Sequence, residues 1–387
     1  MTADLAASTP LRVLRPWALL LVPAALALAG VLVRYLAYVS VTAAPSPQGF
    51  ADAMCVWDCY WYGDVALHGY QAHPEQLNFG GPAGIANWAF FPLYPMLIAA
   101  VGKLVSASPA ALGGVVSPLL ALGAVLASWP AFDGNRRAYY LFAALLLVGP
   151  FSFYFASLYS ESLFLLLTVL AFVALARRRY VAAGIFGTLL SATRTVGVLF
   201  VFAILAEALI EFRARRLGPA AMLRELLRRP DIILGIFLVP LGLFAFMAWL
   251  HLATGDALAF AHIQRAWDRE IVNPASALWF ALTSPGGQTR DPVILAFAGI
   301  GGLLLCGALF WRRQIPAAVF CTLCLVLALT NGVESMLRFV AALAPLGIVL
   351  AQILSRWPWL SWLSFVVFVV LDFAWTISWI HQQGALM

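Results

Sequence analysis

The chain has 387 residues, of which 63% are hydrophobic and 10% are charged, whereas soluble domains carry about 25% charged residues. This composition excludes a soluble globular protein. The net charge of +6 comes from 22 arginines and one lysine set against 17 acidic residues. Because the arginines form short clusters beside apolar runs, and not a stripe that follows a phosphate backbone, membrane lipids are expected partners and nucleic acid is not.

Apolar runs long enough to cross a bilayer, which takes about 20 residues, recur along the whole chain. They lie at about 17–37, 110–129, 138–156, 160–176, 231–252, 291–310, 315–331, 337–354 and 359–380. The first follows Arg12 and Arg15 and is too long for the core of a signal peptide, so we expect a retained membrane anchor. The polar stretches at about 40–88 and 254–290 are too short to bury cores of their own. We therefore predict one integral membrane domain over residues 1–387, in the inner (plasma) membrane of a bacterium.

The positions of the arginines decide how two further segments are interpreted, because cytoplasmic loops carry an excess of positive charge. The basic clusters at 177–179 and 213–229 should both be cytoplasmic, so the apolar stretch 180–210 is predicted to form two short helices that meet near 191–194. The loop at 40–88 contains no lysine or arginine and belongs outside, so residues 90–105 are predicted to form a re-entrant or interfacial helix.

These choices predict an all-α polytopic protein with about 11 transmembrane helices and an N-terminus inside. Six charged or titratable residues then fall at the external membrane face, where the two polar loops form the expected active-site face facing the periplasm or exterior. They are Asp58, Glu161, Arg194, His262, Arg265 and Arg338. Charges at a membrane are costly, so such residues indicate a functional site, here a polar cavity that opens outward.

The first external loop places an acidic residue among aromatic residues, in the stretch CVWDCYWYGD at 55–64. On a helix, Trp57, Trp61 and Val65 form one stripe, suited to the aromatic belt at the membrane surface. Asp58 and Tyr62 lie beside this stripe. Asp58 is therefore a candidate general base held near the lipid, although the same residue in this place could simply cap or solvate an interfacial helix.

Two neighbours of Asp58 bear on this interpretation. Asp64 lies about 120° round the helix from Asp58, so only one of the two carboxylates is expected to face a shared site. Cys55 and Cys59 flank Asp58 at helical spacing. They either form a disulfide in an oxidising exterior or remain two thiols, since a bridge between adjacent helical turns is strained.

Two further charges interrupt apolar runs on the outer side. Glu161 lies in SLYSESLF at 157–164, with Tyr154 and Tyr159 close in sequence. Glu161 either stabilises the positive end of a helix that Ser160 caps, or belongs to a functional site. Arg194 has no acidic neighbour in sequence, and its expected partner is either the phosphate of a lipid ligand or Glu161.

The second external loop contains AHIQRAWDR at 261–269, in which His262, Arg265 and Arg269 share one helical face. This cationic face either touches lipid headgroups or contributes to substrate binding. Arg338 stands just inside the start of another predicted helix, where the helix dipole disfavours a positive charge. We therefore expect Arg338 to face an anion.

Five short motifs follow one another along the chain. They are CVWDCYWY with Gly69-Tyr70, FFPLYP at 90–95, YSESLF at 159–164, Thr193-Arg194 with Gly197, and Ser335 with Arg338-Phe339 and Pro345. In order and rough spacing, over about residues 55–350, they resemble the PIG-V-like mannosyltransferase family. The resemblance implies a GT-C glycosyltransferase, a helical membrane bundle that takes its sugar from a polyprenyl-phosphate-linked donor and holds a catalytic aspartate in its first external loop.

The resemblance also implies roles for individual residues. Asp58 matches the base of the family, and Glu161, Arg194 and Arg338 match its other polar motif positions. Eukaryotic relatives add mannose to the glycosylphosphatidylinositol anchor in the endoplasmic reticulum, but this chain is compact, arginine-rich and bacterial in character, so that acceptor does not carry over. Substrate-binding roles for Trp57, Tyr62, His262 and Arg265 rest on their positions alone.

Together these observations predict an inverting enzyme that moves a hexose, by resemblance mannose, to a hydroxyl of a lipid or glycolipid acceptor. Arg194 and Arg338, helped by Arg265, would hold the donor phosphate. Neither a cofactor nor a metal ion is expected, because the external carboxylates are spread out and not grouped as ligands. The rival classes are a polytopic transporter, against which the lack of an internal sequence repeat argues, and a lipid-presenting subunit without catalysis.

Overall fold

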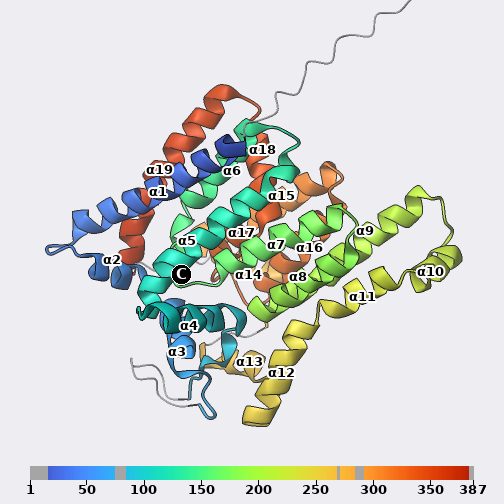
Figure 1. Cartoon of the computed structure of the whole chain (residues 1–387), viewed down its shortest axis with the longest axis horizontal. Helices are drawn as coiled ribbons and strands as arrows, with labels where there is room; N and C mark the ends of the chain where they lie inside the picture. The colour runs from blue at the N-terminus through green and yellow to red at the C-terminus, as the bar shows by residue number, and fades with distance from the viewer. Residues whose placement is uncertain (1–15, 75–83, 268–270, 284–291, 383–387) are drawn as a thin grey trace, which may run out of the picture.

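The computed structural model describes residues 16–74, 84–267, 271–283 and 292–382, in which every regular element is a helix (Figure 1). Arg12, Arg15 and Arg269 lie outside these residues. The first half of the chain forms α1 (Pro16–Val41), α2 (Pro47–Met54), α3 (Asp58–His68), η1 (Asn87–Ala89), α4 (Leu93–Val105), α5 (Pro109–Ser128), η2 (Trp129–Phe132), α6 (Arg136–Leu147), η3 (Ser152–Phe155), α7 (Glu161–Ala176) and α8 (Tyr180–Thr193). The second half forms η4 (Thr195–Leu199), α9 (Phe200–Ala214), α10 (Pro219–Leu227), α11 (Pro230–Leu238), α12 (Leu241–Thr254), α13 (Ala259–His262), η5 (Ile263–Trp267), α14 (Pro274–Thr283), α15 (Pro292–Trp311), α16 (Ile315–Leu329), α17 (Met336–Ala342), α18 (Ala344–Leu354) and α19 (Pro358–Ile380).

Six helical stretches within the described residues are long and apolar enough to cross a membrane. They are Leu19–Val41, Pro109–Phe132, Thr195–Ala214, Pro230–Thr254, Pro292–Trp311 and Pro358–Ile380, and the bent pair α17 and α18 would make a seventh. The apolar helices α4, α7, α8 and α16 are shorter than these stretches. The protein is an all-helical integral membrane protein. The predicted number of about 11 spans stays a prediction, because it counts three of these shorter helices and two interrupted segments as spans.

The break predicted in the stretch 180–210 is confirmed. Helix α8 ends at Thr193, Arg194 is extended with φ −154° and ψ 144°, and α9 begins at Phe200 after the 3-10 turn η4. Gly197 allows this geometry, because a Cβ atom there would lie 2.3 Å from the carbonyl carbon of Leu190. The turn thus folds back onto the end of α8 and presents Arg194 between two helices.

Two predicted spans are wrong as continuous helices. The segment 138–156 contains α6, which ends at Leu147, and then only the short turn η3; Pro150 disfavours helical geometry at the residue before it. The segment 337–354 is divided into α17 and α18, which meet at 77°. Pro345 stands in the first turn of α18, where its missing N–H is tolerated, and therefore favours a new helix start.

Within the segment 90–105, residues Leu93–Val105 form α4, a helix of 13 residues that packs against α3 and α5. At 1.5 Å per residue its length is about 20 Å, well short of the roughly 30 Å hydrocarbon core of a bilayer. This length fits the predicted re-entrant or interfacial helix, while its depth in the membrane stays a prediction.

A buried ion pair joins the two ends of the chain. Arg34 lies inside α1, which continues to Val41. Its guanidinium is 3.3 Å from Asp372 of α19 and donates a 2.6 Å hydrogen bond to Ser152, which in turn donates to Asp372 at 2.6 Å. Because buried charges in a membrane protein need partners, this triad fixes α1, α19 and the turn η3 against one another.

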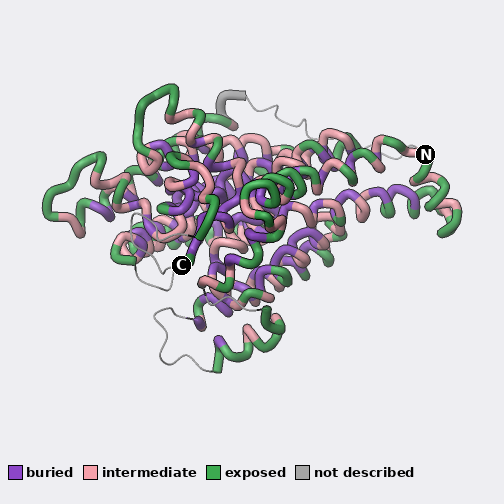
Figure 2. Tube along the Cα trace, turned by 90° about the horizontal axis from the view of Figure 1, so that it is seen from below, coloured by how far each residue is buried: buried purple, intermediate pink, exposed green. Residues whose placement is uncertain are grey.

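Buried residues concentrate where these helices cross (Figure 2). Behind the first loop the core is aromatic and is centred on Trp379 of α19, which is 0% exposed. Its ring lies 4.8 Å from that of Trp57 and 5.5 Å from that of Tyr159, and its indole N–H donates to the carbonyl of Met54. The last helix therefore forms the back wall of the loop that carries Asp58.

Candidate active site

A cavity of about 1500 Å³ lies where the first loop, the α8–α9 break, the second loop and the start of α17 meet. Its lining includes seven of the eight residues predicted for the site, namely Trp57, Asp58, Tyr62, Arg194, His262, Arg265 and Arg338. The eighth, Glu161, is 1% exposed and contacts two of the lining arginines. Residues separated by 280 positions in sequence thus share one site.

Asp58 is the first residue of α3, and a tight turn directs it into the cavity. Trp57 before it has φ 49°, a conformation that non-glycine residues rarely adopt. The hydroxyl of Tyr159 accepts a 3.2 Å hydrogen bond from the backbone N–H of Asp58 and donates a 3.0 Å bond to the carbonyl of Val56. Tyr159 therefore holds both sides of the turn.

The tyrosine hydroxyls beside Asp58 stay neutral. Burial raises the pKa of Tyr159 well above its ordinary value, and the nearby charge of Asp58 adds to this. Burial, followed by the charge of Glu161, also raises the pKa of Tyr62. The hydroxyl of Tyr62 lies 2.7 Å from that of Ser160, so these phenols act as hydrogen-bonding supports.

Four charged side chains form a chain of alternating sign at the cavity wall. Asp58 pairs with Arg338, the Nε of Arg338 lies 3.1 Å from Glu161, and Glu161 pairs with Arg194. Arg338 is in the first turn of α17 and faces anions, as predicted, but these are carboxylates of the protein itself. The sequence left two partners open for Arg194, a lipid phosphate and Glu161, and in the structure Arg194 pairs with Glu161.

Aromatic contacts complete this cluster. The guanidinium carbon of Arg194 lies 4.5 Å from the ring centroid of Phe339, and that of Arg338 lies 5.6 Å from the ring of Tyr159. Both arginines are only partly exposed, at 11% and 13% of their side chains. An arginine carries five N–H donors, so these contacts leave donors that can bind an anion in the cavity.

The predicted divergence of the two loop aspartates is confirmed. Asp64 accepts a 2.7 Å hydrogen bond from the side chain of Asn87 and lies 3.0 Å from the ring nitrogen of His68. Asp58 alone of the two lines the cavity. The sequence left open whether Cys55 and Cys59 are bridged. In the structure they are joined by a disulfide across the turn that carries Asp58.

Two sequence interpretations of this region are wrong. The stripe of Trp61 and Val65 does not face the membrane surface, because the side chains of Trp61 and Val65 are both buried within the protein and Trp61 stacks on Phe90. Ser160 does not cap α7 with its side chain, since its hydroxyl bonds to Tyr62 instead.

The second loop contributes the rim of the cavity. His262 ends the short helix α13, and Arg265 lies in the 3-10 turn η5 that follows it directly; both line the cavity, while the third residue of the predicted face, Arg269, lies outside the described residues. The ring of His262 is 2.6 Å from Asp256, and this hydrogen bond lowers the pKa of that carboxyl. Arg265 lines the cavity and is exposed.

Several residues of the site were not found from the sequence. Tyr159 was noted only as a neighbour of Glu161, and nothing in the sequence linked Phe339 or Trp379 to Asp58. Their roles depend on contacts between distant helices, for which a single sequence carries no signal. Among the described residues, no three His, Cys, Asp or Glu side chains group in a way that could hold a metal ion; that transfer needs no metal stays a prediction.

The arrangement of helices is similar to that of a protein of known structure. ArnT from Cupriavidus metallidurans, solved bound to undecaprenyl phosphate, matches with a TM-score of 0.52 and 14% identity over 89% of this chain and 62% of that chain. An oligosaccharyltransferase from Archaeoglobus fulgidus matches with a TM-score of 0.49 and 13% identity, over 94% of this chain and 53% of that chain.

No protein-family model matches the sequence, and no curated protein matches it closely enough to count as a relative. The PIG-V-like resemblance therefore stays a prediction. The chain spans about three fifths of the length of ArnT, and an identity of 14% carries the fold alone. The protein is an all-helical membrane protein with a GT-C-type fold.

Proposed function

We propose that this protein is a membrane glycosyltransferase that takes a sugar from a polyprenyl-phosphate-linked donor and transfers it to a hydroxyl of a lipid or glycolipid acceptor. The observation that carries the proposal is the Asp58 carboxylate, which lines a large cavity and is held there by Arg338 and by the turn that Tyr159 supports. The GT-C-type fold and the undecaprenyl phosphate bound to ArnT support the donor class. Mannose as the sugar rests on the PIG-V-like resemblance.

In the proposed reaction Asp58 is the general base. The acceptor hydroxyl attacks the anomeric carbon while its proton passes to the carboxylate of Asp58. The bond between the anomeric carbon and the phosphate oxygen breaks, and the polyprenyl phosphate leaves with the electron pair. Because attack comes from the face opposite the leaving phosphate, one displacement inverts the anomeric centre. A positioned base contributes about 10² to 10⁴ in rate.

The arginines supply the complementary charge. Arg338 uses one nitrogen on Asp58 and its Nε faces Glu161, whereas Arg194 uses one nitrogen on Glu161, so further N–H groups of each arginine remain for the donor phosphate. Arg265 at the rim adds a third positive charge, and His262 beside it remains a proposed substrate contact. Charge-assisted hydrogen bonds to phosphate oxygens stabilise the developing negative charge of the leaving group.

The protein would lie in the inner membrane of a bacterium. The cavity would open at the periplasmic or outer face of a bacterial inner membrane, in a single domain whose two polar loops supply its walls. The topology follows from the arginine clusters, because positive loops stay in the cytoplasm.

The test is sugar transfer by the purified chain in nanodiscs, with a panel of polyprenyl-phosphate sugars that includes mannose and with lipid acceptors, the products being identified by mass spectrometry. We expect transfer by the native chain and loss of transfer in Asp58→Asn. Analysis of the anomeric configuration of the product tests inversion. If no sugar is transferred, and proteoliposomes containing the protein instead take up a solute, the protein is a transporter and the proposal is wrong.

A further inference from the structure

Helix α10 joins two helices that are long enough to span the membrane. It lies between α9, whose apolar stretch ends at Ala214, and α11, whose apolar stretch begins at Pro230, and it stands apart from the cavity at the far end of the bundle (Figure 1). Only short links separate it from both. Because these links hold it where the two spans leave the bilayer, α10 is confined to the region of the lipid headgroups at that end.

One side of α10 is apolar and exposed. Leu223 and Leu227 stand one turn apart and are 60% and 67% exposed, whereas Met222 and Leu226 pack against the protein core. Exposed leucines at helical spacing beside spanning helices continue the lipid-facing surface of those helices, which includes Phe237 of α11 at 69% exposed. This face is suited to insertion at the boundary between headgroups and acyl chains.

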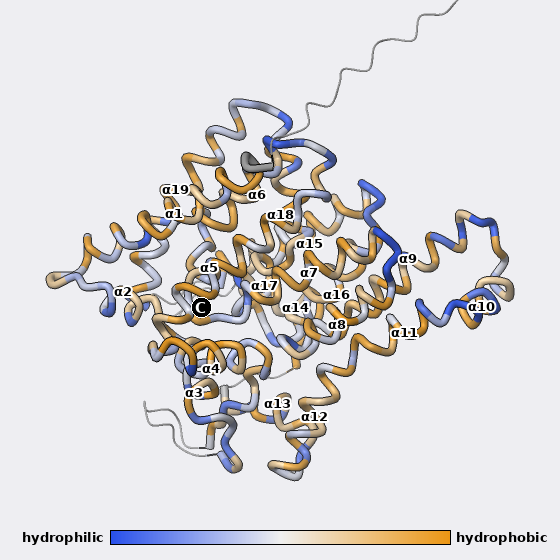
Figure 3. Tube along the Cα trace, in the orientation of Figure 1, coloured by the Kyte–Doolittle hydropathy of each residue, from blue (hydrophilic) through white to orange (hydrophobic). Residues whose placement is uncertain are grey.

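The surroundings of α10 are strongly basic. The segments 177–179 and 207–231, which lie at the end predicted to be cytoplasmic, together contain nine arginines and four carboxylates, and hydrophilic stretches lie at the end of α9 and along α10 in Figure 3. Arg213, Arg216, Arg224 and Arg228 are exposed, and within the described residues none of these four forms an ion pair. Their charge is therefore open to an external anion.

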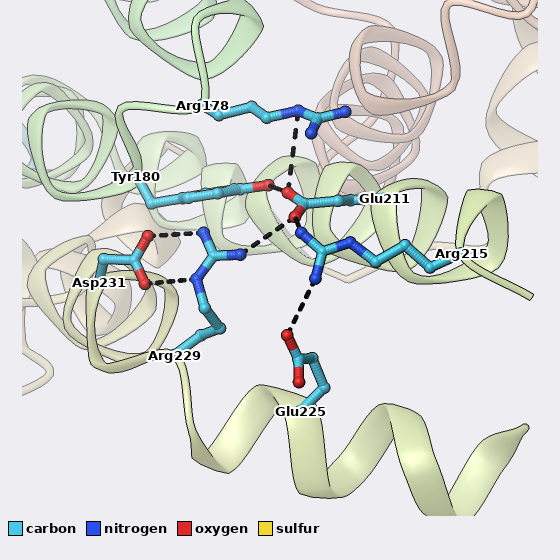
Figure 4. Close-up of polar contacts among 7 residues, drawn as sticks. All are labelled: Arg178, Tyr180, Glu211, Arg215, Glu225, Arg229 and Asp231. Carbon is cyan, nitrogen blue, oxygen red and sulfur yellow. Dashed lines mark hydrogen bonds and ion pairs between the residues drawn. The ribbon is translucent and has the colours of Figure 1, made fainter. Parts of the chain in front are cut away.

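A buried carboxylate fixes the position of this basic surface (Figure 4). Glu211 is 3% exposed and lies 2.5 Å from a nitrogen of Arg215, 3.0 Å from one of Arg229 and 2.8 Å from the hydroxyl of Tyr180. A second nitrogen of Arg215 reaches Glu225 of α10 at 3.0 Å. This network uses the acidic residues internally, so that the four open arginines are not neutralised by them.

We propose that α10 is a membrane-surface helix that binds the headgroups of anionic phospholipids in the leaflet where α9 and α11 end, which is the cytoplasmic leaflet in the predicted topology. Leu223 and Leu227 insert among the acyl chains, while Arg224 and Arg228 bind the lipid phosphates. Charge complementarity and the short links to two spans favour a lipid surface over a soluble partner. This surface lies outside the cavity and does not depend on the transferase proposal.

Insertion is tested with a fluorophore attached at Leu223→Cys in the full chain. The free thiols Cys306, Cys321 and Cys324 are buried, and the other two cysteines form the disulfide, so labelling is selective. In nanodiscs that contain lipids with a quencher on the acyl chain, we expect strong quenching of this label and weak quenching of a matched label at Gln314→Cys, an exposed polar position in the α15–α16 turn. Equal quenching at both positions would contradict insertion.

Lipid preference is tested by titrating phosphatidylglycerol into the protein and counting bound lipids by native mass spectrometry. The double variant Arg224→Gln, Arg228→Gln should bind about 25-fold more weakly, at roughly fivefold for each arginine near the surface. The matched double variant Arg313→Gln, Arg356→Gln removes the same charge at other cytoplasmic turns and should change binding less than about twofold. Equal losses in both variants, or no loss in either, would overturn the proposal.

Discussion

The substitution Asp58→Asn separates the chemistry of the carboxylate from its structural role. The amide has the same shape, and its oxygen still accepts a hydrogen bond from Arg338, but it cannot take up a proton. We expect transfer to fall by about 10² to 10⁴, the usual contribution of a general base. This corresponds to about 3 to 5.5 kcal/mol of transition-state stabilisation.

The structure indicates how much stability the same substitution costs. Removing one partner of a buried ion pair costs about 3 to 5 kcal/mol when the other charge is left alone. Arg338 keeps Glu161 at 3.1 Å, and the side chain of Asp58 is 19% exposed. The loss should therefore be much smaller, about 1 to 2 kcal/mol, and the variant should remain folded and bind its donor.

The assay compares kcat and donor affinity for Asp58→Asn and for Asp64→Asn, which changes the same residue type on the same helix but on a side chain outside the cavity. We expect kcat to collapse in the first variant with donor affinity within a fewfold of the native value, and to be nearly unchanged in the second. If Asp58→Asn is fully active and Asp64→Asn is inactive, the base is Asp64 and the mechanism proposed here is refuted.

Three further predictions follow from the same site. Arg194→Ala and Arg338→Ala should weaken donor binding or slow transfer. Thiol reagents added from outside should label cysteines placed beside both arginines; labelling from the cytoplasmic side alone would refute the shared phosphate site. Tyr159→Phe leaves the buried N–H of Asp58 and the carbonyl of Val56 without their partner, so it should cost about 1 to 3 kcal/mol of stability in a denaturation measurement and lower kcat; an unchanged kcat would show that this support is dispensable. Transfer should persist in excess EDTA, whereas activity lost in the chelator and restored by Mg²⁺ or Mn²⁺ would show that the arginines need a metal.

The sequence by itself determined the class of protein and the broken helix at Arg194. Composition and run length required a helical membrane protein, because in lipid every backbone polar group must be satisfied within the helix. The basic clusters on both sides of residues 180–210 required an even number of crossings there, and the structure divides this stretch at Arg194. Isolated charged or titratable residues in apolar surroundings likewise indicated Asp58, Arg194, His262, Arg265 and Arg338, five residues that the structure brings to one cavity, and Glu161, which contacts two of these arginines.

Only the tertiary structure decided which charge pairs with which, and what faces the lipid. The contacts Asp58–Arg338 and Arg34–Asp372 join segments 280 and 338 residues apart, and no periodicity in the sequence records such a pairing. The stripe of Trp61 and Val65 is identical in pattern to a membrane-facing stripe, yet both side chains are buried within the protein and Trp61 stacks on Phe90. The physical reason is that lipid and protein interior are equally apolar, so hydrophobicity alone does not distinguish a side chain in contact with one from a side chain in contact with the other.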